Sequence, residues 1–287
     1  MKNFKIKSYC KINLSLKIIK KLKNGYHNIS SLITFSDLHD IISISKIKKS
    51  KDKITFSGKF CKGINKKSNT ITAALKILRE KKLIKNQSFE INVKKNIPHG
   101  SGLGGASSNA SYLLNYFNNT MRLKLKKNEM INMAKKIGSD VPICLEKKNT
   151  FLTGKKDKII RVNNKFNLNL LIVYPNIICS TRKIYKRNRI KNSTGNEYYY
   201  NTKNSIKLMH RLKNEKNDLE KIVIKIYPRI GKIINYIKSQ KGCVFSRITG
   251  SGSACIGIFS NRPNTISAQK SIRSKYPKYW CVVSKTI

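Results

Sequence analysis

The sequence predicts an α+β fold built from two domains. Stretches in which apolar and polar residues alternate, typical of half-buried strands, are interleaved with stretches whose apolar residues recur every three or four positions, typical of amphipathic helices. The chain has 287 residues, of which 39% are apolar, and this is enough for two domains that each bury a core. We place the boundary near residue 160, which gives domains over residues 1–160 and 161–287.

The N-terminal half begins with two predicted strands. Residues 4–19 and 32–47 alternate apolar with polar side chains, and the Asn24-Gly25 dipeptide between them is typical of a tight turn. Asn69 is placed to cap a helix, and residues 88–94 alternate again as a strand. The helix after Asn69 has one apolar face, formed by Ile71, Ala74, Leu75 and Leu78.

A glycine-rich segment then connects the strand at 88–94 to a helix over residues 106–119. The helix is predicted from an apolar stripe with i, i+3, i+4, i+7 spacing, formed by Ala110, Leu113, Leu114 and Phe117. A second helix over residues 128–137 ends at Gly138 and leads into the segment Ser139-Asp140-Val141-Pro142.

The C-terminal half is predicted to be an α+β sandwich. Residues 169–174 are apolar and precede Pro175, as in a buried strand that opens a domain, whereas residues 186–205 have no apolar period and predict an exposed loop. A helix begins at Pro228 and stops at Gly242. The remaining predicted elements are strands at 243–248, 254–259 and 279–284 and a helix at 264–275.

The composition is strongly basic, with 61 Lys and Arg against 13 Asp and Glu and a formal net charge of +48. Such a charge is typical of proteins that bind nucleic acid or acidic membranes. However, 50 of the 61 cations are lysine, and lysine accompanies heavy use of Ile and Asn throughout the chain. These three residue types share A/T-rich codons, so we interpret most of the charge as genomic base bias and expect no specific nucleic-acid partner.

The cysteines and histidines indicate a reducing compartment and no structural metal. Seven cysteines are scattered and never spaced as C-x-x-C, and the four histidines lie far apart in the sequence. The N-terminal segment interrupts its apolar residues with lysine, and no run of 18 apolar residues occurs. We therefore expect a cytoplasmic protein without a signal peptide or a membrane span.

The glycine-rich segment has the chemistry of a phosphate cradle. Glycine lets the backbone approach an anion closely, and the N–H groups at a helix start bind phosphate. The alternative is a flexible glycine turn. The pattern matches neither the Gly-Lys-Ser/Thr of a Walker loop nor the third glycine of a dinucleotide fingerprint. The residues concerned are Gly100, Gly102, Gly104, Gly105, Ser107 and Ser108.

Several motifs together resemble those of the GHMP small-molecule kinases. Pro98 to Ala110 is similar to their P-x-G-x-G-L-G-G-G-S-S-N/D-A-A loop, and Thr249-Gly250-Ser251-Gly252-Ser253 matches a later block. Within that superfamily, Lys11-Ile12-Asn13-Leu14, Asn24-Gly25-Tyr26-His27 and Ile137-Gly138-Ser139-Asp140-Val141-Pro142 resemble blocks of the 4-diphosphocytidyl-2-C-methylerythritol kinases. The resemblance implies a ribosomal-protein-S5-domain-2-like N-terminal domain, a ferredoxin-like C-terminal domain and a substrate site between them.

The resemblance also implies roles for individual residues. Asp140 is expected to be the catalytic base and Lys11 its paired cation, although the sequence by itself leaves Asp140 open as a helix cap and Lys11 as a solvated surface residue. ATP, accompanied by Mg²⁺, is expected to bind along Pro98, His99, Gly100, Ser101, Gly102, Leu103, Gly104, Gly105, Ala106, Ser107 and Ser108. Asn13, Tyr26, His27 and Tyr185 are expected to bind the substrate, and Gly250, Ser251 and Gly252 to form a wall of the site, with ordinary surface and a plain hairpin as the alternatives.

Four positions depart from the pattern of the resembled family. Tyr9-Cys10 stands where that family usually has Pro-Ala, and Lys156 lies in a segment where Gly-x-Gly-Glu is usual. Ala106 replaces a loop glycine, so a negative φ is expected there. None of these changes touches the expected acid–base chemistry.

The function implied by the resemblance is ATP-dependent phosphorylation of the 2-hydroxyl of 4-diphosphocytidyl-2-C-methyl-D-erythritol, a step in isoprenoid precursor biosynthesis, by a monomer or homodimer. A related kinase acting on homoserine, shikimate or mevalonate is the nearest alternative, and the Gly25-Tyr26-His27 segment argues against it. A basic nucleic-acid-binding protein that stacks bases on Tyr198, Tyr199 and Tyr200 is the second alternative.

Overall fold

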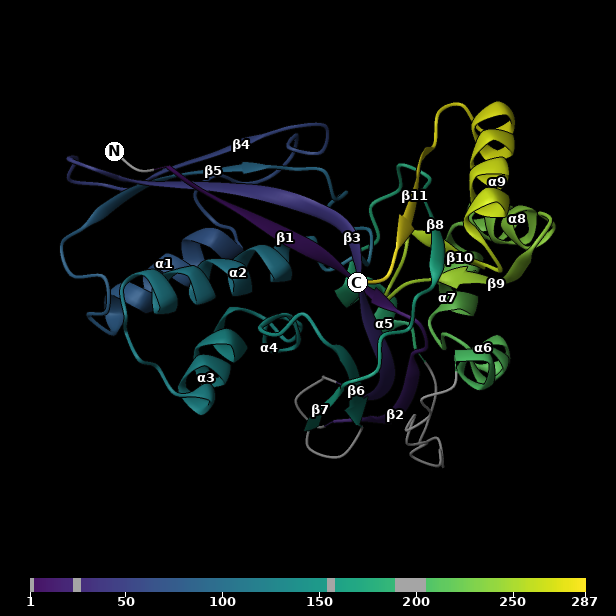
Figure 1. The fold of residues 1–287 in the computed structure, drawn as a ribbon, viewed down its shortest axis with the longest axis horizontal. Coiled ribbons are helices and arrows are strands. Elements are labelled where there is room, and N and C mark those ends of the chain that lie inside the picture. The colour runs from purple at the N-terminus through teal and green to yellow at the C-terminus, as the bar shows by residue number, and fades with distance from the viewer. Residues whose placement is uncertain (1–2, 23–26, 154–157, 189–204) are drawn as a thin grey trace. The chain divides into compact units, whose positions relative to one another are not determined.

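The computed structural model describes residues 3–22, 27–153, 158–188 and 205–287 (Figure 1). The chain forms two compact units that interleave along the sequence. The first unit comprises residues 1–11, 38–99 and 104–147, and the second unit comprises residues 12–37, 100–103 and 148–287. Two long strands, β1 (Phe4–Asn13) and β3 (His27–Ile47), contribute to both units.

The first unit packs helices against a β-sheet. Within it, β3 is antiparallel to β5, with Ile44 opposite Ile91, and β4 is parallel to β5. The helices α1 and α2 lie along one face of these strands (Figure 1), where Phe117 of α2 meets Phe89 of β5 edge to face. Besides β1 and β3, the elements are β4 (Lys53–Ser57), α1 (Thr70–Glu80), β5 (Ser88–Lys94), α2 (Gly105–Thr120), α3 (Lys127–Ile137) and α4 (Val141–Cys144).

Local sequence explains where these helices begin and end. The Asn69 side chain accepts hydrogen bonds from the backbone N–H groups of Ile71 and Thr72, which caps α1 as predicted. The apolar stripe of α2 is buried in the core of the unit. Gly138 is the C-cap residue of α3, so the predicted end of that helix is confirmed.

The second unit contains a four-stranded antiparallel sheet in the order β11-β8-β10-β9. The helices α8 and α9 cover one face of it (Figure 1), and α8 buries Ile230, Ile233 and Ile237. The first half of β3 pairs with β2 and β6, and β6 pairs with β7. The elements are β2 (Lys17–Lys21), β6 (Asn149–Thr153), β7 (Lys158–Val162), β8 (Asn169–Tyr174), α5 (Thr181–Lys186), α6 (Ser205–Asn214), α7 (Glu220–Ile226), α8 (Pro228–Lys238), β9 (Cys243–Ile248), β10 (Cys255–Phe259), α9 (Arg262–Lys275) and β11 (Trp280–Lys285).

The α+β fold class is confirmed, and the differences from prediction are local. The strand predicted over 4–19 is divided into β1 and β2, because Leu14 and Leu16 donate their N–H groups to the carbonyls of Leu32 and Lys216. The helix predicted to run up to Gly242 ends earlier, at Lys238. Missed by the prediction were β4, β6, β7, α4, α5, α6 and α7.

The compact units do not follow the predicted boundary. Residues 12–37 and 148–160 precede position 160 yet belong to the second unit, because β3 carries pairing partners for both units. The division of the chain into family domains at residue 160 stays a prediction. Of the predicted loop at 186–205, residues 189–204 lie outside the described residues, as do the predicted turn at Asn24-Gly25 and Lys156.

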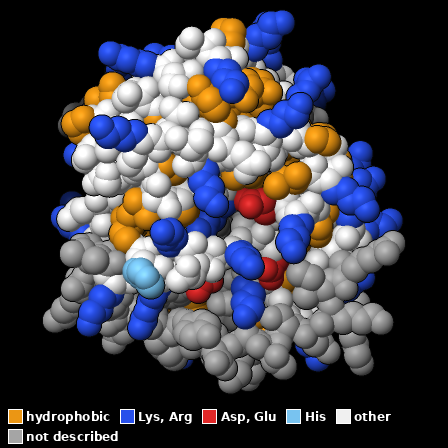
Figure 2. All heavy atoms as spheres, turned by 90° about the vertical axis from the view of Figure 1, so that its right-hand side faces the viewer, with side chains coloured by type: hydrophobic (Ala, Val, Ile, Leu, Met, Phe, Trp, Pro, Cys, Tyr) orange, Lys and Arg blue, Asp and Glu red, His pale blue; other side chains and the backbone are white. Residues whose placement is uncertain are grey.

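Two features bear on membrane and nucleic-acid binding. No helix within the described ranges is both long and apolar enough to cross a membrane. On the face shown in Figure 2, Lys and Arg side chains are dispersed among polar and apolar ones, and those of the described residues form no continuous cationic surface there. This dispersal is consistent with base bias as the origin of the charge.

Candidate active site

A buried lysine and a half-exposed aspartate form an ion pair in the first unit. The Nζ atom of Lys11, on β1, lies 3.1 Å from Oδ2 of Asp140. The Lys11 side chain is 3% exposed, whereas Asp140 is 39% exposed. Burying an ammonium group without a counterion is costly, so the pair accounts for the position of Lys11 and excludes the alternative of a solvated surface lysine. The carboxylate remains open to a ligand.

The alternative that Asp140 caps a helix is wrong. Asp140 occupies the N-cap position of the four-residue helix α4, but its side chain accepts no hydrogen bond from the helix N–H groups. The carboxylate pairs with Lys11 instead. Its position therefore follows from a tertiary contact and not from local helix chemistry.

Gly104 and Gly105 bring the glycine-rich segment against Lys11 and Ile97. Gly104 has φ = +65°, and a Cβ built there would lie 2.9 Å from Cε of Lys11. At Gly105, a Cβ would lie 2.9 Å from Cγ2 of Ile97. A side chain at either position would displace a neighbour, and at Gly104 the positive φ favours glycine as well.

The N-terminus of α2 presents free N–H groups directly after Gly104. The first N–H groups of a helix have no acceptor within it. In α2 the first bond of the helix runs from the N–H of Ser108 to the carbonyl of Gly104, so the N–H groups of residues 105–107 come before it. The positive end of the helix dipole adds to the attraction for an anion. Ala106 lies in this first helical turn, so the expected negative φ is confirmed.

The serines and other predicted loop residues differ in what they can offer a ligand. The Ser108 hydroxyl is fully buried and donates to the carbonyl of Tyr9 over 2.6 Å, so its hydrogen is already used. Ser107 is half-buried. Ser101 and Leu103 are buried as whole residues, so a direct contact of either with a ligand stays a prediction. Of the remaining loop positions, Pro98 is buried, His99 is half-buried and Gly100 is exposed.

In the second unit, two glycine turns pack backbone to backbone. A Cβ on Gly102 (φ = +81°) would lie 2.1 Å from the carbonyl oxygen of Thr249, and one on Gly250 would lie 3.0 Å from the carbonyl oxygen of Gly102. The Ser251 hydroxyl is 2.8 Å from Oγ1 of Thr181, and Gly252 also has a positive φ of 75°. The turn at 249–253 is thus more closely packed than a plain hairpin connection requires.

Asn13 is anchored beside this turn and is itself buried. Its backbone N–H donates to Oγ1 of Thr249 over 2.8 Å, and its Nδ2 donates to the hydroxyl of Ser31 over 2.8 Å. The side chain is 3% exposed. A direct contact with substrate, which the sequence led us to expect, stays a prediction.

His27 and Tyr185 form a ring pair in the second unit. Their centroids lie 5.1 Å apart at an interplanar angle of 42°. Burial, and next the nearby positive charge of Lys21, lower the pKa of His27 below its ordinary value of 6.5. Its Nε2 atom is buried and has no hydrogen-bond partner among the described residues. Tyr26 lies outside the described residues.

The sequence did not single out the residue that ties down the 249–253 turn. Asn217 is 4% exposed, and its Nδ2 donates to the carbonyls of Ile248 and Gly250 over 3.2 and 2.8 Å. Its Oδ1 accepts from the N–H of Leu219. An Asn-Asp dipeptide in a polar stretch is a common turn signal, so nothing in the sequence distinguished Asn217 from other turn residues.

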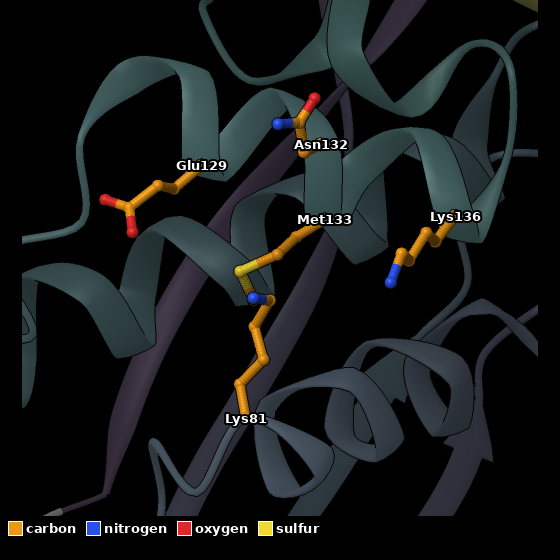
Figure 3. A pocket seen from close by; sticks show the side chains of 5 residues that line it. All are labelled: Lys81, Glu129, Asn132, Met133 and Lys136. Atoms are coloured by element: carbon orange, nitrogen blue, oxygen red, sulfur yellow. The ribbon is translucent and has the colours of Figure 1, made fainter.

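A groove of about 430 Å³ lies elsewhere in the first unit, between the end of α1 and α3. Figure 3 shows Met133 of α3 reaching toward Lys81, while Glu129 points away. The lining of this groove contains no predicted site residue. No group of three or more His, Cys, Asp or Glu side chains with the arrangement of a metal site occurs in the described part of the chain.

Comparison with known proteins decides the family. The family model for the N-terminal domain of GHMP kinases matches residues 69–148, and that for their C-terminal domain matches residues 200–278. The 4-diphosphocytidyl-2-C-methyl-D-erythritol kinase of Pelagibacter ubique (strain HTCC1062) is 40% identical over 287 residues, which is 100% of both chains. The chain belongs to this family of GHMP kinases. The namesake from Caldicellulosiruptor bescii is 31% identical over 94% of each chain.

Solved structures agree on the two-domain GHMP kinase fold. A 4-(cytidine 5'-diphospho)-2C-methyl-D-erythritol kinase superimposes with a TM-score of 0.76 at 20% identity, covering 98% of this GHMP kinase and 99% of that chain. A homoserine kinase from Cytophaga hutchinsonii gives a TM-score of 0.77 at 15% identity, covering 100% and 95%. At these identities the structures establish the fold alone, so the choice between alcohols rests on the sequence relatives.

Proposed function

We propose that this chain transfers the γ-phosphoryl group of ATP to the 2-hydroxyl of 4-diphosphocytidyl-2-C-methyl-D-erythritol, releasing ADP. One observation carries the proposal: Lys11 contacts both the glycine at the start of α2 and the carboxylate of Asp140. A phosphate-binding helix start and a base candidate are thereby linked through one buried cation. The naming of the full-length relatives favours the cytidine diphosphate alcohol over other acceptors.

Asp140 is proposed as the general base. Phosphoryl transfer needs a group that accepts the hydroxyl proton of the acceptor and cations that balance the charge of the transferred phosphoryl group. Asp140 has a half-exposed carboxylate at the start of α4, and Lys11 pairs with that carboxylate over 3.1 Å. The same ammonium group supplies positive charge next to the reacting atoms. Lys11 is therefore proposed as the second catalytic residue.

The nucleotide phosphates are proposed to bind the N–H groups of residues 105–107, with the Ser107 hydroxyl as a further donor. Mg²⁺ in kinases keeps several waters and takes one or two protein oxygens together with substrate phosphates. The half-exposed carboxylate of Asp140 and the hydroxyl of the half-buried Ser107 fit that limited demand. When bound, the ion would neutralise the charge that develops on the β- and γ-phosphates.

The cytosine base is proposed to bind at the ring pair of His27 and Tyr185, together with Tyr26, which precedes His27 in the sequence. An aromatic face can stack on a nucleobase, and a histidine ring such as that of His27 has polar nitrogens that can hydrogen-bond its edge. Binding energy from this distant part of the substrate fixes the reacting hydroxyl, so truncated polyols should react poorly.

A parallel kinase assay tests the proposal. ADP formation would be measured with ATP, Mg²⁺ and, separately, the cytidine diphosphate alcohol, homoserine, shikimate and mevalonate, against a blank without alcohol. We expect turnover above the blank with the cytidine substrate and little with the others. Faster turnover of a small alcohol would support the related kinases instead. RNA binding that weakens steeply with salt, without kinase activity, would support the nucleic-acid alternative.

A cytoplasmic location stays a prediction, supported by the seven cysteines, all of which are free thiols as a reducing compartment maintains them. The choice between monomer and homodimer also stays open to measurement.

A further inference from the structure

A fully buried carboxylate lies beneath the start of α2 in the first unit. Asp40 is 0% exposed and accepts four hydrogen bonds. Its Oδ1 accepts from the backbone N–H groups of Asn96 and Ile97 over 2.7 and 2.9 Å. Its Oδ2 accepts from Nδ2 of Asn109 over 3.0 Å and from the ammonium group of Lys95.

All four donors flank the glycine-rich segment. Residues 95–97 lead from β5 into it, and Asn109 lies on α2 just after it. The Asn109 side chain is 3% exposed, and its Oδ1 has no hydrogen-bond partner in the described parts of the chain. Asp40 is thus what orients this amide. One carboxylate therefore joins the chain entering the loop to the helix leaving it.

Lys95 is a buried cation close to the start of α2. Its side chain is 3% exposed, and its Nζ would lie 3.4 Å from a Cβ on Gly105, the first residue of α2. A cation here adds to the positive end of the helix dipole and is unfavourable unless a counterion offsets it. Asp40 is that counterion. Losing it would leave an uncompensated buried charge under the residues that are proposed to hold phosphate.

We infer that Asp40 is a positioning residue for the nucleotide: it holds Lys95 and Asn109 so that the N–H groups of residues 105–107 keep the geometry that binds phosphate. This inference rests on the proposed function, since it names what supports the ATP site. It makes Asp40 responsible for nucleotide affinity and not for proton transfer, because the carboxylate is buried and its hydrogen-bonding capacity is used within the protein.

The test is Asp40→Asn in the full-length protein, with the affinity for ADP measured by calorimetry and both KM values by steady-state kinetics. We expect the Kd for ADP and the KM for ATP to rise about tenfold, as displaced positioning groups typically cause. The KM for the alcohol should stay within about twofold of wild type, because only the phosphate-binding turn is disturbed.

Asp52→Asn is the matched control. Asp52 is a mostly buried carboxylate of the same unit that pairs with Arg79 over 2.8 Å and accepts from the N–H of Phe89, but it contacts no part of residues 95–109 in any bond described for it. The Asp52→Asn variant should lower the thermal midpoint, as Asp40→Asn does, while leaving the KM for ATP unchanged. An equal rise in the KM for ATP in both variants would reduce the role of Asp40 to stability and overturn the inference.

Breaking a buried ion pair is strongly destabilising, so Asn109→Ala is the second variant if Asp40→Asn fails to fold. It removes one arm of the network without leaving a charge unpaired, and the Kd for ADP should rise about threefold to tenfold. Wild-type affinity for ADP in each folded variant would overturn the inference alone. A wild-type protein that binds no nucleotide would overturn both the inference and the proposed function.

Discussion

Gly104 lies directly against the side chain of Lys11. A Cβ on Gly104 would come within 2.9 Å of Cε and 3.1 Å of Cβ of the lysine. The absence of a side chain on Gly104 therefore leaves room for the aliphatic part of the Lys11 side chain, which extends to Asp140. Substituting this glycine should disturb the ion pair as well as the loop.

We expect Gly104→Ala to lower kcat by about tenfold or more, because displacement of the lysine stem misaligns the base. It should also cost about 1–3 kcal/mol of unfolding free energy, since alanine is strained at φ = +65°. Steady-state kinetics and thermal unfolding of the variant measure the two effects.

Gly242→Ala separates strain from catalysis. Gly242 also has a positive φ, +76°, and a Cβ there would lie within 2.9 Å of Nδ2, Cγ and Cβ of Asn264 in the second unit. This variant should lose stability while its kcat stays near wild type. Equal losses of kcat in both glycine variants would mean that Gly104 acts only through stability.

We expect Asp140→Asn to lower kcat by about 10²- to 10⁴-fold, the usual contribution of a general base. The amide keeps the shape of the side chain, so the Kd for ADP should change little, whereas thermal stability should fall because the buried Lys11 loses its counterion. Glu90→Gln is the control, because Glu90 is an exposed carboxylate of the same unit paired with Lys53 over 2.6 Å. Wild-type turnover by the Asp140 variant would remove its assignment as base.

Much of the fold could be predicted because the signal is local, whereas the sequence by itself left Lys11 open as a solvated surface residue and the family resemblance implied its pairing with Asp140. The alternation at residues 88–94 and the apolar run at 169–174 correspond to β5 and β8 as observed. A lysine among apolar neighbours on a strand needs an anionic partner, and the structure provides Asp140. The short strands β4, β6 and β7 were missed because five residues give too little periodicity.

The residues that hold the site in place could not be predicted, because their contacts join distant parts of the chain. Asp40 meets Lys95 across 55 positions, and Asn217 meets Gly250 across 33. Neither residue belongs to a motif that marks it, and each is typical of exposed turns when read alone. Only the pairing of β3 with β5 and the packing of the 249–253 turn bring these partners together.

His27 should show an imidazole titration midpoint below 6.5 in NMR spectra. Its folded pKa is lowered by burial and Lys21, so the unfolded chain binds the proton first as the pH falls. Stability is therefore complete above pH 6.5 and declines as the pH falls through 6.5 toward the folded pKa. The thermal midpoint should drop more between pH 7 and pH 5 in wild type than in His27→Gln. A midpoint above 6.5, or equal drops in the two proteins, would contradict this account.

Asn217→Ala should loosen the 249–253 turn. The variant removes the donor to the carbonyls of Ile248 and Gly250, and leaving buried carbonyls without a partner costs about 1–3 kcal/mol. Because Gly250 packs against the backbone of Gly102, we expect the KM values to rise about threefold to tenfold with the shift of the loop. Asn149→Ala is the control, because Asn149 is equally buried in the second unit and binds Thr34 instead. It should lose similar stability at unchanged KM, and a matching rise in its KM values would show that the turn has no special role in binding.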